Sequence, residues 1–171
     1  LGVDDELKFR QNRKTYQEIC FEQVGMKFQN EEYVFSVPKR ASANAGEYLT
    51  KIGTPLQSLR RPVIGLNTGS GARFAGKKLP LESYVRLAEK FYQEMKGTVF
   101  LLGGNDEIER NFVIQQRSKV PVVNTGSHPI LNFAALVRSC NALVTGDTTA
   151  MHIAIAVKTP VVAYFASTCA Q

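Results

Sequence analysis

The stretch Gly146-Asp-Thr-Thr-Ala-Met-His152 brings a carboxylate, two hydroxyls and an imidazole close together in the chain. It follows the apolar run 142–144, which predicts a short buried strand ending near Thr145. After the turn at Gly146, we expect a helix over 151–157 with Asp147 as its N-cap. The first turn of a helix carries backbone N–H groups without partners and the positive end of the helix dipole. This stretch is therefore suited to bind an anion such as a phosphate.

Asp147 and His152 each allow a second interpretation. As a cap alone, Asp147 would stabilise the helix by about 0.5–2 kcal/mol and take no part in binding. A histidine on an otherwise apolar helix face is ordinarily a core residue. The functional interpretation is that Asp147 contacts a ligand or orients the turn and that His152 faces the same ligand.

A second loop, Asn67-Thr-Gly-Ser-Gly71, offers small residues and backbone N–H groups that a diphosphate could approach closely. Lys77 and Lys78 follow it, and a lysine there could neutralise a leaving diphosphate as its charge develops. The alternative is a solvated loop lysine. Neither the dinucleotide motif G-x-G-x-x-G nor the P-loop motif is complete, because the third glycine is missing and Lys78 stands where the P-loop needs serine or threonine.

The elements that must position these loops alternate regularly from Pro62 onward. Continuous apolar runs predict five strands, over 63–67, 98–102, 120–123, 142–144 and 161–165. Helical spacing predicts intervening helices over 81–95, 107–117, 131–139 and 151–157. Strands that are apolar throughout are typical of a parallel sheet covered by helices on both faces. Right-handed crossovers then give a Rossmann-like, doubly wound α/β fold, whose ligands bind at the carboxyl ends of the strands.

Residues 1–61 lack the regular alternation of strands and helices, and they contain no motif that indicates a catalytic or binding site. We expect helices over 14–24 and 41–52, separated by an extended segment over 32–38. This part is interpreted as a lead-in packed on the domain formed by residues 62–171.

Composition and charge narrow the class of protein. The chain has 171 residues, 44% of them hydrophobic, and a formal net charge of +6, which favours anionic partners. Its basic residues are scattered and not interleaved with aromatics, so a solvated basic surface is the alternative and a nucleic-acid platform is not predicted. No run of about eighteen apolar residues predicts a membrane span, and no signal peptide is visible. Three widely spaced cysteines fit reduced thiols in the cytoplasm.

Residues 146–152 resemble the G-D-[ST]-G-x-x-H signature of the lipopolysaccharide heptosyltransferases, glycosyltransferase family nine. Gly69-Ser-Gly71 with Lys77-Lys-Leu-Pro80 is similar to that family's Gly-rich turn and K-x-W-P element. Residues 101–104 and 160–168 fall where the family has two further strand ends, and the likeness runs in order from about 62 to 171. Thr149 stands in place of the signature glycine and Leu79 in place of the usual tryptophan.

The resemblance implies the C-terminal, donor-binding half of an inverting, metal-independent GT-B glycosyltransferase that needs no cofactor. The expected donor is a nucleoside diphosphate sugar, with ADP-heptose preferred, and the expected acceptor is a lipid-linked saccharide of the lipopolysaccharide core. The acceptor site and the catalytic base would lie in an N-terminal half absent from this chain, so the chain alone should be inactive. The enzyme would be cytoplasmic, peripheral at the inner membrane face, and without nucleic-acid partners.

Eleven residues are predicted to bind the donor, from the two loops, the second strand end and the start of the last helix. They are Thr68, Gly69, Ser70, Gly71, Lys77, Gly104, Gly146, Asp147, Thr148, Thr149 and His152. Lys77 is preferred over Lys78, and Thr148 is the first candidate for direct phosphate contact. Glu107 and Glu109 are close to where ribose hydroxyls could be accepted, but they are interpreted as charged helix surface.

Two other functions remain open from the sequence. One is a nucleotide-sugar epimerase of the same architecture, which analysis of the reaction products would separate from a transferase. The other is a non-catalytic nucleotide-binding module in which Thr149 blocks the donor. Calorimetric titration with ADP, UDP and GDP would test that alternative.

Overall fold

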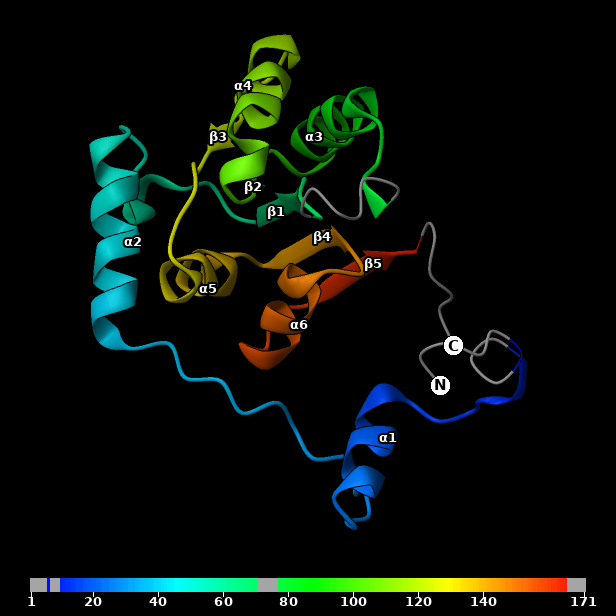
Figure 1. Ribbon diagram of the computed structural model, residues 1–171. Helices are drawn as coiled ribbons and strands as arrows, with labels where there is room; N and C mark the ends of the chain where they lie inside the picture. The colour runs from blue at the N-terminus through cyan, green and yellow to red at the C-terminus, as the bar shows by residue number, and fades with distance from the viewer. Residues whose placement is uncertain (1–5, 7–9, 71–76, 166–171) are drawn as a thin grey trace. The chain divides into compact units, whose positions relative to one another are not determined.

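The computed structural model describes residues 6, 10–70 and 77–165 (Figure 1), which fall into two compact units divided between Tyr33 and Val34. The first unit contains helix α1, Tyr16–Gln23. Its start is a capping box, in which Thr15 Oγ1 accepts the Glu18 N–H (3.2 Å) and the Glu18 carboxylate accepts the Thr15 N–H (2.6 Å). None of the residues of α1 is buried.

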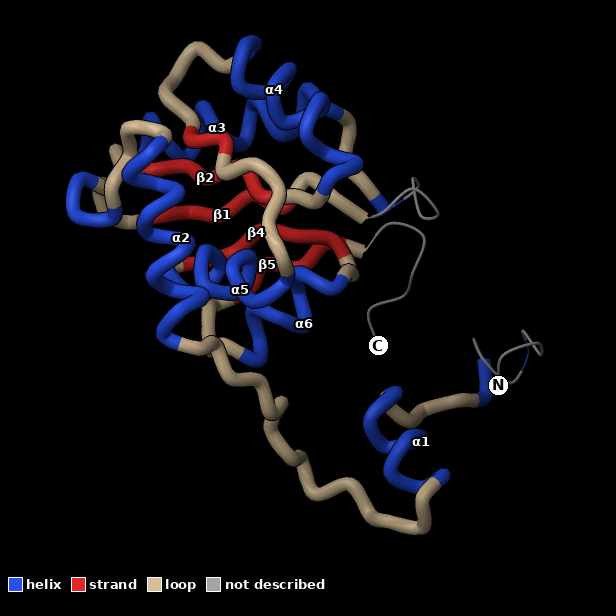
Figure 2. Tube along the Cα trace, turned by 60° about the vertical axis from the view of Figure 1, so that its left-hand side comes forward, coloured by secondary structure: helices blue, strands red, loops and turns tan. Residues whose placement is uncertain are grey.

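The second unit is built on a five-stranded sheet in which every pair of neighbouring strands is parallel (Figure 2). The strands are β1 Val63–Asn67, β2 Thr98–Leu102, β3 Val123–Asn124, β4 Ala142–Gly146 and β5 Val161–Tyr164. Their order, β3-β2-β1-β4-β5, confirms the predicted parallel α/β sheet. The fourth strand ends one residue after Thr145, close to its predicted end.

β3 differs from its prediction over 120–123, because only Val123 and Asn124 pair with β2. Pro121 lacks the N–H that a ladder needs. Just before it, the Ser118 hydroxyl donates to the Val120 carbonyl (2.9 Å). The chain therefore joins the sheet three residues later than the apolar run suggests.

Helices cover both faces of the sheet, as predicted. They are α2 Lys39–Lys51, α3 Leu81–Met95, α4 Ile108–Arg117, α5 Ile130–Ser139 and α6 Thr149–Ala156, with 3₁₀ turns η2 Leu56–Ser58 and η4 Asn105–Glu107. Residues of α2, α5 and α6 share one buried cluster, and residues of α3 and α4 share the other. Strand residues alternate between the two, so Val63 faces the first cluster and Ile64 the second.

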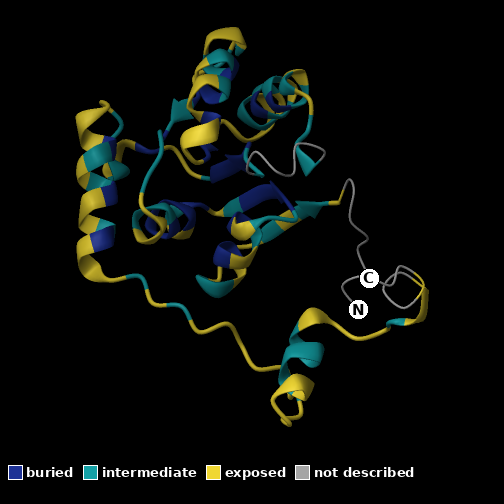
Figure 3. Ribbon diagram, viewed as in Figure 1, coloured by how far each residue is buried: buried dark blue, intermediate teal, exposed yellow. Residues whose placement is uncertain are grey.

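The three central strands are the most buried part of the unit (Figure 3). Gly65 lies in the middle of β1, where an added Cβ would come within 2.8 Å of Leu102 and 2.9 Å of Leu143. A glycine there lets these two leucines fill the core. From β1, the strand order proceeds to β2 and β3 on one side and to β4 and β5 on the other. The carboxyl ends of β1 and β4 therefore form the switch point where such sheets bind ligands.

Candidate functional site

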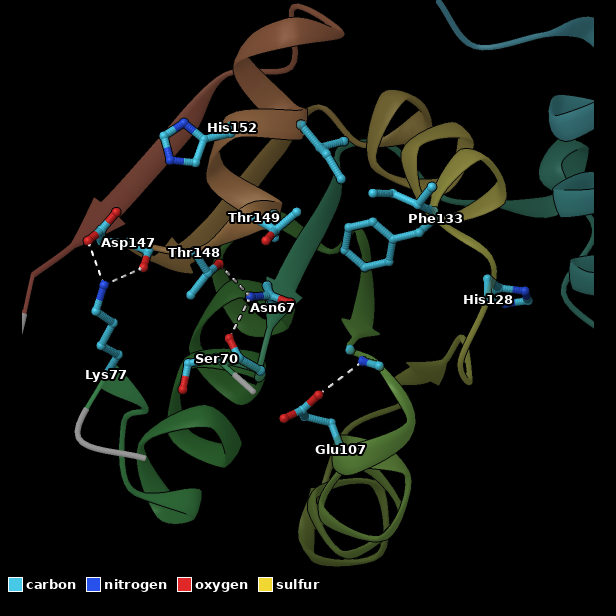
Figure 4. A pocket seen from close by; sticks show the side chains of 16 residues that line it. Asn67, Ser70, Lys77, Glu107, His128, Phe133, Asp147, Thr148, Thr149 and His152 are labelled. Carbon is cyan, nitrogen blue, oxygen red and sulfur yellow. Dashed lines mark hydrogen bonds and ion pairs between the residues drawn. The ribbon is translucent and has the colours of Figure 1, made fainter. Parts of the chain in front are cut away.

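A cavity of about 680 Å³ lies at this switch point (Figure 4). Its walls come from the loop after β1, the loop after β2, the beginning of α5 and the turn from β4 into α6. Eight of the eleven predicted donor-site residues line it, namely Gly69, Ser70, Lys77, Gly104, Asp147, Thr148, Thr149 and His152. Gly71 lies outside the described residues. The fold thus brings three loops together that are up to 80 residues apart in sequence.

The two other predicted residues lie beside the cavity and not in its wall. Thr68 is fully buried, and its hydroxyl donates to Asn111 Oδ1 on α4 (2.5 Å), away from the cavity. Gly146 allows close packing, because an added Cβ would lie 2.9 Å from the Lys77 carbonyl oxygen. Gly146 therefore lets the loop before α3 approach the end of β4.

The prediction that Asp147 caps α6 is wrong. The helix begins at Thr149 and its N-cap is Thr148, with no side-chain capping bond. Asp147 instead binds Lys77, whose ammonium nitrogen lies 2.7 Å from Asp147 Oδ2 and 3.2 Å from its carbonyl oxygen. The carboxylate thus binds a lysine instead of the helix N–H groups, and the ion pair joins the two loops at one side of the cavity (Figure 4).

Asn67 holds the threonine hydroxyls of this turn in place. The amide is 4% exposed at the end of β1, and its Nδ2 is within hydrogen-bonding distance of Thr145 Oγ1 (3.0 Å), Thr148 Oγ1 (3.4 Å) and the Gly69 carbonyl (3.0 Å). Thr145 and Thr148 also join their hydroxyls (3.2 Å). Asn67 is not among the residues predicted from the sequence to bind the donor. The signal it offered was an amide that ends an otherwise apolar strand.

Glu107 is the second carboxylate of the cavity, and its interpretation as charged helix surface is wrong. The residue is 3% exposed, because it ends the turn η4 and faces inward, whereas Glu109 on α4 is exposed as expected. Glu107 Oε2 accepts the Gly104 N–H (3.0 Å), and Oε1 lies 2.8 Å from Lys78 Nζ. Lys78, which the sequence ranks below Lys77, does not line the cavity itself but binds a carboxylate of its wall.

Two glycines make room for this carboxylate. A Cβ on Gly69 would lie 2.7 Å from Glu107 Oε2, and one on Gly103 would lie 2.6 Å from the Glu107 Cβ. Side chains at either position would therefore push Glu107 out of its place.

Apolar side chains of Ile130, Phe133 and Ile153 also line the cavity. Figure 4 shows Phe133 on the side away from Lys77 and Asp147. His128 lies beside it, edge-on to Tyr48 with ring centroids 4.4 Å apart, and its Nε2 is 2.6 Å from the Thr125 carbonyl oxygen. The cavity thus combines an apolar wall, hydroxyls at a helix start and two lysine–carboxylate pairs. Such a site suits a ligand with a flat ring, hydroxyls and anionic groups.

His152 also faces this cavity. It is exposed on α6, so the structure does not support the alternative of a core histidine. The imidazole can therefore reach a ligand bound at the start of the helix.

Within residues 6, 10–70 and 77–165, no three side chains of histidine, cysteine, aspartate or glutamate gather closely enough to hold a metal ion. No helix in the described part of the chain has the length and apolar character needed to cross a membrane.

Comparison with known proteins gives a consistent result. The family model for glycosyltransferase family 9 (heptosyltransferase) matches residues 8–171. Lipooligosaccharide heptosyltransferase 2 of Haemophilus influenzae is 32% identical over 116 residues, which are 65% of this chain and 33% of that protein. The chain thus aligns with about a third of the curated relative's length.

Two solved structures share the fold. A glycosyl transferase family 9 protein from Veillonella parvula superposes with a TM-score of 0.72 at 23% identity, over 86% of this chain and 42% of its own. The E. coli ADP-heptose lps heptosyltransferase II superposes with a TM-score of 0.61 at 24% identity, over 76% and 38%. In both cases the shared part is less than half of the solved chain.

Proposed function

Because the chain belongs to glycosyltransferase family 9, the heptosyltransferases, we propose that it forms the C-terminal, donor-binding half of a GT-B enzyme. Residues 62–171 would be the nucleotide-sugar-binding domain and residues 1–61 its lead-in. The whole enzyme would transfer heptose from ADP-heptose onto a lipopolysaccharide-core acceptor at the cytoplasmic face of the inner membrane. The similar protein named for lipooligosaccharide and the structure titled for ADP-heptose support this choice. The family match favours a transferase over the epimerase.

The observation that carries the proposal is the cavity at the switch point. At its α6 end, the first-turn N–H groups, the Thr148 hydroxyl and Lys77 would bind the diphosphate. Thr149 and His152 would lie beside it. Charge-assisted hydrogen bonds of this kind contribute about 1.5–3 kcal/mol each.

At the other end, the Glu107 carboxylate would accept hydroxyls of the ribose, and the base would lie against Phe133 and Ile153. The burial of Glu107 and its direction into the cavity support this role (Figure 4). A carboxylate has about four acceptor positions, and the contacts to Lys78 and Gly104 occupy two of them.

In the proposed reaction, an acceptor hydroxyl attacks the anomeric carbon from the face opposite the diphosphate. The bond from that carbon to the diphosphate oxygen breaks, the nucleoside diphosphate leaves, and the configuration inverts. Lys77 and the helix start would stabilise the charge that develops on the leaving group, so we propose that no metal is needed. The proton of the acceptor hydroxyl would pass to a base in an acceptor-binding half, for which the greater length of the solved structures leaves room. The chain alone would then bind the donor without transferring it.

Calorimetric titration of the protein with ADP, UDP and GDP tests the proposal. We expect ADP to bind most tightly and to bind equally well in EDTA and in magnesium. An absence of nucleotide binding would indicate a degenerate module in which Thr149 blocks the donor. Acceptor-dependent release of ADP from this chain alone would contradict the assignment of the base to another half.

A further inference from the structure

Lys77 and Lys78 are adjacent in sequence, but their ammonium groups bind different carboxylates. Lys77 binds Asp147 in the turn before α6, and Lys78 binds Glu107 at the end of η4. Each lysine side chain is 17% exposed. The two residues therefore serve opposite parts of the cavity, the first beside the proposed diphosphate and the second beneath the proposed ribose.

The pair between Lys78 and Glu107 is the more deeply buried of the two. The Glu107 side chain is 4% exposed, compared with 25% for Asp147. A buried carboxylate is costly unless a cation and hydrogen bonds compensate its charge. Lys78 supplies the cation at one oxygen, and the Gly104 N–H supplies a hydrogen bond at the other.

These two contacts also fix the direction of the carboxylate. One partner holds each oxygen, so the plane of the group cannot rotate without losing a contact. Gly69 packs directly against the same group, since an added Cβ would lie 2.7 Å from Oε2. The orientation held in this way points the carboxylate into the cavity (Figure 4).

We propose that Lys78 is a positioning residue for recognition of the ribose. It acts through Glu107, by balancing the buried charge and holding the carboxylate where it accepts ribose hydroxyls. This inference rests on the proposed function, because it requires a nucleotide in the cavity. It gives the two consecutive lysines separate tasks, with the diphosphate assigned to Lys77 and the sugar of the nucleotide to Lys78.

The test compares ADP with 2′-deoxy-ADP and 3′-deoxy-ADP by calorimetry, and adds adenosine as a ligand without phosphates. The wild-type protein should prefer ADP over at least one deoxy analogue by roughly tenfold, since a charge-assisted hydrogen bond is lost. Lys78→Met should bring the ratio of the affinities for ADP and that deoxy analogue close to one. It should also lower the affinities for adenosine and for ADP by a similar factor. Lys78→Arg, which keeps the cation, should retain most of the preference.

Lys77→Met is the matched control. It should weaken ADP and its deoxy analogues equally, leaving the preference and the affinity for adenosine unchanged. If Lys78→Met instead weakens ADP but not adenosine, Lys78 binds the phosphates and the inference is overturned. A preference unchanged in folded Lys78→Met also overturns it. Failure of the wild-type protein to bind ADP overturns the proposed function instead.

A second variant covers the case in which Lys78→Met does not fold, as judged by circular dichroism. Glu107→Gln removes the buried charge, and adding Lys78→Met to it leaves no buried ion without a partner. The double variant should match Glu107→Gln within about twofold for every ligand, because coupled residues are not additive. A further loss of ADP affinity in the double variant would assign Lys78 to the phosphates and contradict the proposal.

Discussion

Asn67 and Thr145 are joined by a hydrogen bond of 3.0 Å from the Asn67 amide to the Thr145 hydroxyl, just beyond the last paired residues of β1 and β4. The backbone register of these strands ends with Leu66 opposite Val144. A side-chain hydrogen bond thus continues the pairing of β1 and β4 at the point where the two strands separate to form the cavity. Both side chains are buried, so the bond is shielded from water.

We expect Asn67→Ala to lower the free energy of unfolding by about 1–3 kcal/mol, because it removes the donor from the buried Thr145 hydroxyl and from the partly buried Gly69 carbonyl. It should also weaken ADP binding, since the Thr148 hydroxyl loses a partner. Urea unfolding and calorimetry measure the two effects. Asn44→Ala, at an exposed position of α2, is the control and should change stability by less than about 0.5 kcal/mol.

Lys77→Ala or Thr148→Val should each weaken ADP binding roughly tenfold or more, since 1.4 kcal/mol corresponds to a factor of ten. The reason is the position of both groups in the cavity wall beside the start of α6. Lys119→Ala changes an exposed lysine that does not line the cavity and should leave the affinity unaltered. Equal ADP affinities in all three variants and the wild type would place the phosphates elsewhere.

Gly103→Ala should destabilise the protein by about 1–3 kcal/mol, because its Cβ would lie 2.6 Å from the Glu107 Cβ and 3.2 Å from Asn111 Nδ2. Gly104 is a matched control in the same turn. Its Cβ would meet Glu107 Oε2 at 3.5 Å, an ordinary contact, and its backbone is extended. The melting temperature of Gly103→Ala should therefore lie clearly below that of Gly104→Ala. Equal melting temperatures would show that Glu107 can move aside without a loss of stability.

Stability should fall at alkaline pH through Cys140, because burial raises the pKa of its thiol to about 12 from an ordinary 9.0. Above pH 9, the unfolded chain releases this proton while the folded protein keeps it, so unfolding becomes more favourable as pH rises. Between pH 9 and 10 the loss should be about 1 kcal/mol. Urea unfolding at both pH values should show that the free energy of unfolding falls less in Cys140→Ala than in the wild type. An equal fall in the two proteins would assign the effect to other titrating groups.

The sequence was most informative where one physical rule acts alone. Continuous apolar runs identified β1, β2 and β4, and helical spacing located α3 with the bounds that the structure has, Leu81–Met95. The apolar run predicted β3 at the wrong position, because Pro121 lies within the run and has no N–H to donate to a neighbouring strand. Local signals thus describe elements well where no single residue interrupts them.

The site was harder to predict because long-range contacts override local preference. Asp147 is a good N-cap by residue type, but Lys77, 70 residues away, pairs with it instead. Glu107 looked like helix surface, because nothing local shows that η4 turns it inward toward Lys78. The apolar wall at Phe133 depends on where α5 begins relative to α6, which only the folded chain defines.

The pairing of Lys77 and Lys78 with the two carboxylates of the cavity has a consequence for which anions can enter. Each ammonium group already has an internal anion as its partner, so the four charges cancel and the pocket offers no excess positive charge from these side chains. Inorganic phosphate or chloride must compete with Asp147 for Lys77 or with Glu107 for Lys78. Such an ion has no ring or sugar hydroxyls that could make further contacts in the cavity. A nucleotide also brings hydroxyls for a carboxylate and a ring for the apolar wall. If the cavity binds a nucleotide as proposed, Asp147 and Glu107 would therefore disfavour inorganic phosphate and chloride relative to that ligand.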